Sequence, residues 1–443
     1  MSEVLGGGRR RALRVMLWVV IAAQTTVAAP LAVELATRGE AERAAVDWVL
    51  AGAQRRVSAG EVEERFSPRI LAQVPAPDMA AMINALGPDG PFNVIDTLYD
   101  RDDELALVAR GQSIPWRITI DLDRHRRIDH LLFEPHAPPH PRADTWSEFD
   151  AALRRIAPEV GLLAARVVEG RCEPVHAIAP DVALSLASGF KLYVLGAVAE
   201  AIAARRITWE QRVTIQRRQI VHSSSRYLDA AGETATVRDL ARAMWDVSDN
   251  TATDVLIELV GREAVEAALT TMGMAEPARN IPLLLLREWS ILKYGRPPLA
   301  PEYLQLAGVS PRRAFLSGRI AELGGRLGEL DWSVKPAHAE IEWFATPNDQ
   351  CRALLHLQAM AKRPGIRQIR EVVQTTAGGK ITYASYKGGS EAGVLSHALY
   401  FERGGERYVV VVLLRNRDVE IAMPPELIRD AAYLLHSGEK AGR

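Results

Sequence analysis

The spacing of hydrophobic residues changes within the first third of the chain. Up to about residue 86, apolar residues recur at helical spacing. From residue 92 to residue 133 the period becomes two, which is typical of strands joined by turns. Helices followed by an antiparallel sheet predict an α+β domain, which we place at residues 32–134.

A proline-rich segment follows and separates this pattern from the next. Four of its seven residues from Pro135 to Pro141 are proline, which neither a helix nor a strand tolerates. His136 and His140 raise the question of a metal site, but no third ligand is nearby in the sequence. We therefore predict a solvated linker at residues 135–145 and no metal site.

The second pattern begins near Trp146 with a short helix. Residues 161–178 then read as a hairpin, and the helix predicted over residues 191–204 is apolar on every side, as buried helices are. The chain ends in further predicted elements, namely strands at 380–387, 396–401 and 408–414 and a helix at 425–436. A helical middle between strands from both ends predicts one sheet covered by helices, a three-layer α/β domain at residues 146–443.

The N-terminus has the layout of an export signal. An apolar run over residues 15–23, continuing weakly to Ala29, follows a basic head formed by Arg9, Arg10, Arg11 and Arg14. The stretch that ends at Ala29 suits a signal peptidase, but Pro30 does not. Residues 1–31 are therefore predicted to be a cleaved signal or an uncleaved membrane anchor. The arginines also fit twin-arginine export, and the alternative is a basic leader before a core helix.

Charge and cysteine content narrow the choice of partners and compartment. The 443 residues carry 54 basic and 55 acidic side chains, a net charge of −1. Such a balance gives no field that attracts nucleic acid, so a nucleic-acid partner is not expected. The two cysteines, Cys172 and Cys351, are too few for a disulfide framework, and two buried thiols are favoured over a disulfide between them.

Candidate chemistry begins at a Ser-x-x-Lys run, Ser188 to Lys191, at the head of the apolar helix. In the first helical turn, backbone N–H groups and the helix dipole favour negative charge that develops near the serine. Lys191 lies one turn on, where burial beside another cation lowers the pKa of an amine and lets it accept the serine proton. The alternative for Ser188 is a plain helix cap.

The run alone does not identify a site, because a second copy extends from Ser290 to Lys293. We interpret this second copy as a pair on a helix surface. The context favours Ser188, since two further motifs follow it in order. They are Ser248-Asp249-Asn250, before a predicted helix, and Lys387-Gly388-Gly389-Ser390, after a predicted strand.

Together the three motifs resemble those of class A β-lactamases and penicillin-binding proteins, with Gly388 in place of the usual threonine. The stretch from Lys387 to Val394 and the helix-then-sheet first domain resemble a subgroup. These are the two-domain serine hydrolases of clavulanic acid gene clusters. The resemblance implies a nuclear-transport-factor-2-like (NTF2-like) first domain and a β-lactamase-like second domain.

The resemblance also implies a role for each matching residue. Ser188 would be the acylated nucleophile, Lys191 its base and Ser248 a proton relay to the leaving group. Asn250 and Lys387 would bind substrate, and Gly388 and Gly389 would let the strand edge approach it. The backbone N–H groups of Ser188 and Ser390 would form the oxyanion hole, which needs two preorganised donors.

The group that would release the acyl product is the open part of this assignment. In the class A enzymes a glutamate of a Glu-x-x-x-Asn pattern activates the water. One such pattern stands here, from Glu276 to Asn280, with Glu288 and Glu329 as weaker candidates. The alternative for each is an ordinary surface glutamate. Without such a base, β-lactam turnover would be slow and esters would be favoured.

The sequence thus predicts an exported, monomeric serine hydrolase that acts through an acyl-enzyme on a β-lactam-type amide or a carboxylic ester. Its partner would be a small-molecule substrate, with no metal or cofactor. Two rival interpretations remain open. One is a true β-lactamase with fast turnover, and the other is a non-catalytic protein of the same fold that binds β-lactams or peptidoglycan or acts as a sensor.

Overall fold

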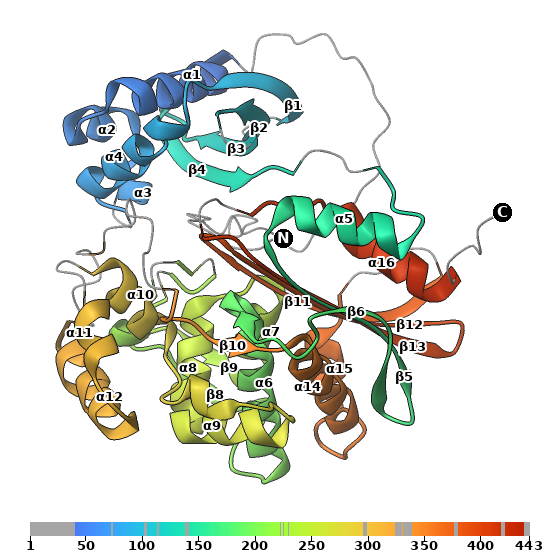
Figure 1. Ribbon diagram of the computed structural model, residues 1–443. Coiled ribbons are helices and arrows are strands. Elements are labelled where there is room, and N and C mark those ends of the chain that lie inside the picture. The colour runs from blue at the N-terminus through green and yellow to red at the C-terminus, as the bar shows by residue number, and fades with distance from the viewer. Residues whose placement is uncertain are drawn as a thin grey trace, which may run out of the picture.

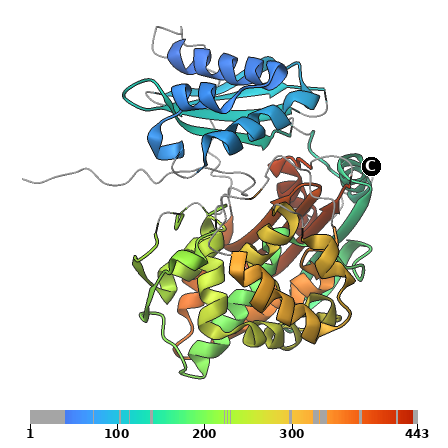
Figure 2. The same cartoon turned by 90° about the vertical axis from the view of Figure 1, so that its left-hand side faces the viewer.

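The computed structural model describes residues 40–437, except 72–73, 102–103, 113–114, 138–140, 222, 225, 229, 296–298, 324–329, 331–338, 376–379 and 418–420. The predicted export segment, His140 and the candidate base Glu329 lie outside the described residues. Within the described part of the chain, no helix has both the length and the apolar character to cross a membrane. Figures 1 and 2 show a smaller N-terminal unit and a larger C-terminal unit.

The N-terminal unit packs helices against one face of an antiparallel sheet with strand order β1-β2-β3-β4. Its elements are α1 (Glu40–Arg55), α2 (Ala59–Arg65), α3 (Pro68–Leu71), α4 (Ala76–Ala85), the 3-10 turn η1 (Gly87–Asp89), β1 (Asn93–Arg101), β2 (Glu104–Arg110), β3 (Pro115–Leu122) and β4 (Ile128–Pro135). The predicted order of helices before strands is confirmed. The NTF2-like character of this unit stays a prediction.

The alternation of side chains along its strands sets the core of this unit. Leu105 and Leu107 of β2 lie on the same face as Ile118 and Ile120 of β3, and all four are buried. Helix α1 adds Val49 to the same cluster, because its apolar residues repeat at the helical period. The helices therefore cover this face of the sheet.

The C-terminal unit is built on a five-stranded antiparallel sheet with strand order β11-β12-β13-β5-β6. These strands are β5 (Glu159–Val168), β6 (Arg171–Ile178), β11 (Ile381–Glu391), β12 (Val394–Arg403) and β13 (Glu406–Arg415). Shorter strands are β7 (Leu184–Ser185), β8 (Arg212–Thr214), β9 (Thr234–Thr236) and β10 (Phe344–Ala345). The first two long strands and the last three come from opposite ends of the unit, as predicted.

Helices lie on both faces of this sheet (Figure 1). The helices of this unit are α5 (Trp146–Ile156), α6 (Lys191–Ala203), α7 (Val237–Asp246), α8 (Asn250–Val260), α9 (Arg262–Thr271), α10 (Leu286–Tyr294), α11 (Ala300–Gln305), α12 (Val309–Phe315), α13 (Ala321–Leu323), α14 (Pro347–Met360), α15 (Gln368–Val373) and α16 (Pro425–Ser437). Short helical turns are η2 (Ala187–Phe190), η3 (Arg217–Gln219), η4 (Pro277–Asn280) and the π-helical η5 (Leu316–Ile320).

Strand β13 shows why the sheet is covered on both sides. Val409, Val411 and Leu413 belong to the cluster that includes α6, whereas Val410 and Val412 belong to the cluster of α5 and α16. All five are fully buried. Side chains alternate between the faces of a strand, so a run without polar residues must have apolar cover on both. The three-layer arrangement follows.

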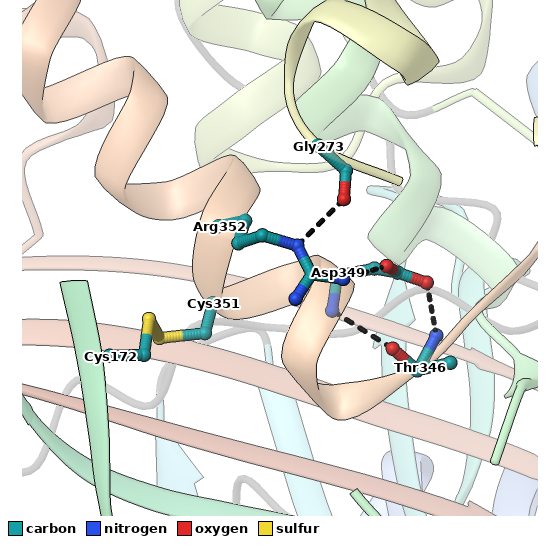
Figure 3. The surroundings of a disulfide bond; sticks show 6 residues. All are labelled: Cys172, Gly273, Thr346, Asp349, Cys351 and Arg352. Atoms are coloured by element: carbon teal, nitrogen blue, oxygen red, sulfur yellow. Dashed lines mark hydrogen bonds and ion pairs between the residues drawn. A yellow bond between two sulfur atoms is a disulfide. The ribbon is translucent and has the colours of Figure 1, made fainter. Parts of the chain in front are cut away.

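One disulfide joins the edge of this sheet to the helix beside it, which corrects the prediction of two free thiols. Cys172 of β6 is bonded to Cys351 of α14, with the two Cα atoms 6.5 Å apart (Figure 3). The fold brings together residues that are 179 positions apart in sequence. Beside the bond, Arg352 donates to the Gly273 carbonyl (2.6 Å) and pairs with Asp349 (2.5 Å), which fixes the start of α14.

Candidate active site

Ser188 lies in the tight turn η2, between β7 and the buried helix α6. The residue before it, Ala187, has a φ of 43°, a left-handed conformation that few side chains adopt. The Leu186 N–H donates to the Trp343 carbonyl (2.8 Å), and the Gly189 N–H donates to the Leu186 carbonyl (2.9 Å). These bonds hold the turn in one shape, with Lys191 starting α6 three residues after Ser188.

Lys191 has no exposed surface and is surrounded by acceptors. Its Nζ donates to the Ser248 carbonyl (2.6 Å) and to Asn250 Oδ1 (2.6 Å), and it lies 3.0 Å from Ser248 Oγ. Burial, and next the positive charge of Lys387, hold the pKa of Lys191 well below its ordinary value. A neutral amine donates two hydrogen bonds, so the two carbonyl contacts leave its lone pair for a hydroxyl.

Ser248 and Asn250 are placed by the loop that begins α8. Ser248 has a φ of 55°, and Asp249 caps the helix by accepting from the Ala252 N–H (2.7 Å). Asp249 also accepts from the backbone N–H of Arg226 (2.7 Å), so a second loop is tied to the same carboxylate. The cap and the left-handed residue together aim the Ser248 hydroxyl at Lys191.

Lys387 reaches the same hydroxyl from β11. Its Nζ donates to Ser248 Oγ (3.0 Å) and to the Gly388 carbonyl (2.9 Å), and its side chain is buried. Burial lowers the pKa of Lys387 to about 7, against the opposing effect of Asp246. Ser248 Oγ thus lies between two buried amines.

Gly389 explains how β11 approaches the nucleophile so closely. A Cβ on Gly389 would lie 2.3 Å from the Leu186 carbonyl oxygen and 2.5 Å from the Ser188 nitrogen, so no side chain fits there. Ser396 of β12, which is paired with Gly389 in the sheet, donates its hydroxyl to the same Leu186 carbonyl (2.6 Å). Ser390, the next residue of β11, is thereby brought near the Ser188 backbone, and its role as an oxyanion donor stays a prediction.

Residues 148–437, more than half of the chain, match the family model described as the beta-lactamase enzyme family. The chain belongs to this family. Its C-terminal unit is therefore that of a β-lactamase-like serine hydrolase. Residues 37–128 match a second model, described as the N-terminal region of the ORF 12 gene product. A search of curated proteins found no match.

Several solved structures are similar to this member of the β-lactamase family. A β-lactamase from Sphaerobacter thermophilus is 19% identical, with a TM-score of 0.45 over 66% of this chain and 98% of that one. A β-lactamase from Desulfarculus baarsii is 18% identical, with a TM-score of 0.44 over 67% and 97%. A mutant of PBP-A, in an acyl-enzyme complex with penicillin G, is 15% identical, with a TM-score of 0.42 over 68% and 98%.

The candidate bases do not join this β-lactamase-like site through any contact of the described residues. Glu276 is exposed at the start of η4, and Asn280 of the same pattern instead binds the Phe344 backbone (2.8 and 2.9 Å). Glu288 pairs with Arg262 (2.5 Å). Among the described residues, no carboxylate is hydrogen-bonded to or ion-paired with Lys191.

The second Ser-x-x-Lys run lies inside the molecule, which corrects the prediction of a surface pair. Ser290 Oγ donates to the Leu286 carbonyl of its own helix (2.8 Å) and is buried. Lys293 is also buried and pairs with Glu391 (2.6 Å) and Glu342 (3.1 Å). The sequence pattern missed these partners because they are 98 and 49 residues away from Lys293.

One residue of the site itself was also missed. Ser223 Oγ accepts from Asn250 Nδ2 (2.7 Å), so the amide of Asn250 is oriented on both sides, by Lys191 and by Ser223. Ser223 stands in a short serine-rich stretch with no recognisable motif, and no signal in the sequence marks it. Within the residues that the structure describes, no three His, Cys, Asp or Glu side chains are grouped to hold a metal.

Proposed function

We propose that this chain is an exported serine hydrolase that forms an acyl-enzyme on Ser188 from a β-lactam-type amide or a carboxylic ester. The observation that carries the proposal is the placement of Ser248 Oγ, 3.0 Å from both Lys191 Nζ and Lys387 Nζ, beside the Ser188 turn. A hydroxyl between two amines of lowered pKa can pass protons in either direction.

In the proposed acylation step, Ser188 Oγ bonds to the substrate carbonyl carbon and its proton goes to Lys191 Nζ. The carbonyl oxygen becomes an oxyanion that accepts from the N–H groups of Ser188 and Ser390. The bond from carbon to the leaving nitrogen or oxygen then breaks. Ser248 gives its proton to the leaving atom, and Lys191 returns a proton to Ser248. The product is an acyl ester on Ser188.

Substrate binding in this proposal uses Lys387 and Asn250. Lys387 offers a cation to a substrate carboxylate, and Asn250, oriented by Ser223, offers its amide to a substrate carbonyl. Gly388 and Gly389 carry no side chain between the strand and the substrate. Lys387 therefore favours acyl donors that carry a carboxylate.

Release of the acyl group is proposed to be slow. A water that attacks the ester needs a base, and none of the described carboxylates contacts Lys191. The rival with fast turnover requires a base such as Glu276, which is exposed at the start of η4. Rapid and repeated nitrocefin hydrolysis would favour that rival.

Export through residues 1–31, as either a cleaved signal or an uncleaved membrane anchor, and a monomeric state are part of the same proposal. The disulfide between Cys172 and Cys351 supports an oxidising compartment, because such bonds are rare in the cytosol. The N-terminal unit carries none of the proposed catalytic residues, and we assign it no chemical step.

Mass spectrometry of the protein after incubation with a fluorescent penicillin or simple acyl esters tests the central claim. The wild type is expected to gain one acyl group on Ser188, and Ser188→Ala is expected to gain none. Ser290→Ala is the matched control, since Ser290 begins the other Ser-x-x-Lys run. Acyl transfer to Ser188→Ala, or none to the wild type from any donor, would contradict the proposal.

A further inference from the structure

A buried ion-pair cluster lies beside the Ser188 turn and takes no part in the proposed chemistry. At its centre is Lys293 of α10, whose side chain is 1% exposed. Lys293 Nζ lies 2.6 and 2.9 Å from the two carboxylate oxygens of Glu391 and 3.1 Å from Glu342 Oε1. The Trp289 indole N–H donates to the same Glu342 oxygen (2.8 Å). We call these four residues the Lys293 cluster.

The pair of Lys293 with Glu391 connects the Lys293 cluster to the end of β11. Glu391 is the last residue of that strand and follows Ser390 directly. Two residues earlier, Gly389 lies against the Ser188 nitrogen, with no room for a Cβ. Any shift of Glu391 along or across the strand therefore changes where the Ser390 N–H lies relative to the Ser188 N–H.

The pair of Lys293 with Glu342 connects the same cluster to the Ser188 turn. Glu342 is followed by Trp343, whose ring stacks on Phe190 of η2 with centroids 3.9 Å apart and an interplanar angle of 6°. The Trp343 carbonyl accepts from the Leu186 N–H (2.8 Å). The Trp343 indole N–H donates to the Leu284 carbonyl (3.2 Å), just before α10. Residues on both sides of Ser188 are therefore fixed by the segment that carries Glu342.

The charges of the Lys293 cluster stabilise the ion pairs that join Lys293 to Glu391 and Glu342. Burial lowers the pKa of Lys293, but the carboxylates of Glu391 and Glu342 outweigh it and raise the pKa above its ordinary value. Burial, and next the Glu342 carboxylate, raises the pKa of Glu391 well above its ordinary value. The opposite charges of the cluster face one another inside the molecule, where an unpaired charge would be costly.

We propose that Lys293 is a positioning residue for the oxyanion hole: it ties the end of β11 to the Ser188 turn and so sets the spacing of the Ser188 and Ser390 N–H groups. The inference rests on the proposed acyl-enzyme function. Oxyanion stabilisation depends on donors that are already in place, so a small error in their spacing slows acylation while substrate binding changes little.

The test measures acylation of Ser188 by a fluorescent penicillin in Lys293→Met. The maximal acylation rate constant is expected to fall about 10- to 100-fold, which is less than the roughly 100- to 1000-fold loss when one oxyanion donor is removed outright. The donor concentration for half-maximal rate is expected to stay within about threefold, because Lys387 and Asn250 are untouched. Lys293→Arg, which keeps the cation, is expected to recover most of the rate.

The matched control is Arg262→Met, which removes the buried pair with Glu288 (2.5 Å) at the other end of the α10 region. It is expected to lower stability but to leave the acylation rate constant unchanged. Should Lys293→Met fail to fold, Glu391→Ala removes the side chain that ties the end of β11 to Lys293 and leaves the pair of Lys293 with Glu342 in place. The rate constant is then expected to fall in this variant, with the half-maximal concentration unchanged.

The outcomes separate the two proposals. Wild-type acylation together with an unchanged rate constant in Lys293→Met or Glu391→Ala overturns the positioning role and leaves the acyl-enzyme proposal standing. Equal losses in Lys293→Met and Arg262→Met also overturn it, because they indicate a general effect of stability. A wild-type protein that accepts no acyl group from any donor overturns both.

Discussion

Lys191 and Lys387 approach one hydroxyl from two different elements: the Nζ of each lies 3.0 Å from Ser248 Oγ. Both side chains are buried, and two neighbouring ammonium groups disfavour each other. The pKa of Lys191 is held well below its ordinary value, and that of Lys387 is lowered to about 7. The hydroxyl therefore has an amine able to accept a proton on one side and a cation on the other.

Removing this hydroxyl is expected to slow acylation without unfolding the protein. In Ser248→Ala the relay between the lysines is lost, and the acylation rate constant should fall about 100-fold or more, the usual contribution of a positioned proton-transfer group. Stopped-flow fluorescence with a labelled penicillin measures the rate. Acylation at the wild-type rate would show that protons do not pass through Ser248.

Ser248→Gly is the companion variant, because Ser248 has a φ of 55°. Glycine removes the same hydroxyl and adopts left-handed backbone without the strain of a Cβ, which is about 1 kcal/mol. The glycine variant is expected to be as slow as the alanine variant and to unfold at a higher denaturant concentration. If the two variants differ in rate, the loss includes backbone displacement.

The lowered pKa of Lys387 predicts how acylation depends on pH. Lys387 is a cation below its pKa of about 7 and is neutral above it. If this cation binds the substrate carboxylate, the efficiency of acylation by an anionic donor falls as the pH rises through about 7. The rate constant at saturation should fall less, because a bound carboxylate raises the pKa of Lys387 again.

An uncharged acyl ester is the control for this pH profile, since it gives Lys387 no carboxylate to bind. Its acylation efficiency is expected to show no fall near pH 7 and to rise with pH until Lys191 is neutral. Rates measured with both donors from about pH 5 to about pH 8, the range in which folded proteins are usually most stable, test this expectation. A parallel fall for both donors would place the titration in the acylation machinery instead.

The sequence predicted those parts of the site whose residues lie close together along the chain. Ser188 and Lys191 are one helical turn apart, and Ser248 and Asn250 belong to one loop, so each motif implies its own geometry. The apolar run after Lys191 likewise predicted the buried helix α6. The order of the motifs then distinguished the two Ser-x-x-Lys runs.

What the sequence missed depends on contacts across the fold. Lys293 pairs with Glu391 over 98 residues, and Cys172 bonds to Cys351 over 179. No motif indicates either pairing, and a buried lysine looks like a surface lysine in the sequence until its carboxylates are located. The role of Glu276 stays a prediction, because its pattern resembles a catalytic loop while its side chain is exposed at the start of η4.

Close packing at Gly389 predicts that even a methyl group is harmful there. In Gly389→Ala the Cβ would lie 2.3 Å from the Leu186 carbonyl oxygen, a backbone atom that cannot rotate away. We expect a loss of about 1–3 kcal/mol in the free energy of unfolding and at least about 10-fold slower acylation. Gly318→Ala is the control, because nothing lies within 4 Å of its Cβ. A wild-type acylation rate in Gly389→Ala would mean that β11 does not touch the Ser188 turn in solution.

The disulfide is expected to stabilise the C-terminal unit without taking part in acylation. Closing a loop of 179 residues in the unfolded chain favours the folded state by about 3–5 kcal/mol. The double variant Cys172→Ser/Cys351→Ser should therefore lose that much in denaturant unfolding, and the wild type should lose it when reductant is added. Reductant should have no effect on the double variant, which controls for effects of the reductant other than reducing this disulfide.

Acylation of Ser188 should stay unchanged below the unfolding transition, because β6 lies at the sheet edge opposite β11. Equal unfolding free energies for the two proteins without reductant would mean that the thiols are not joined.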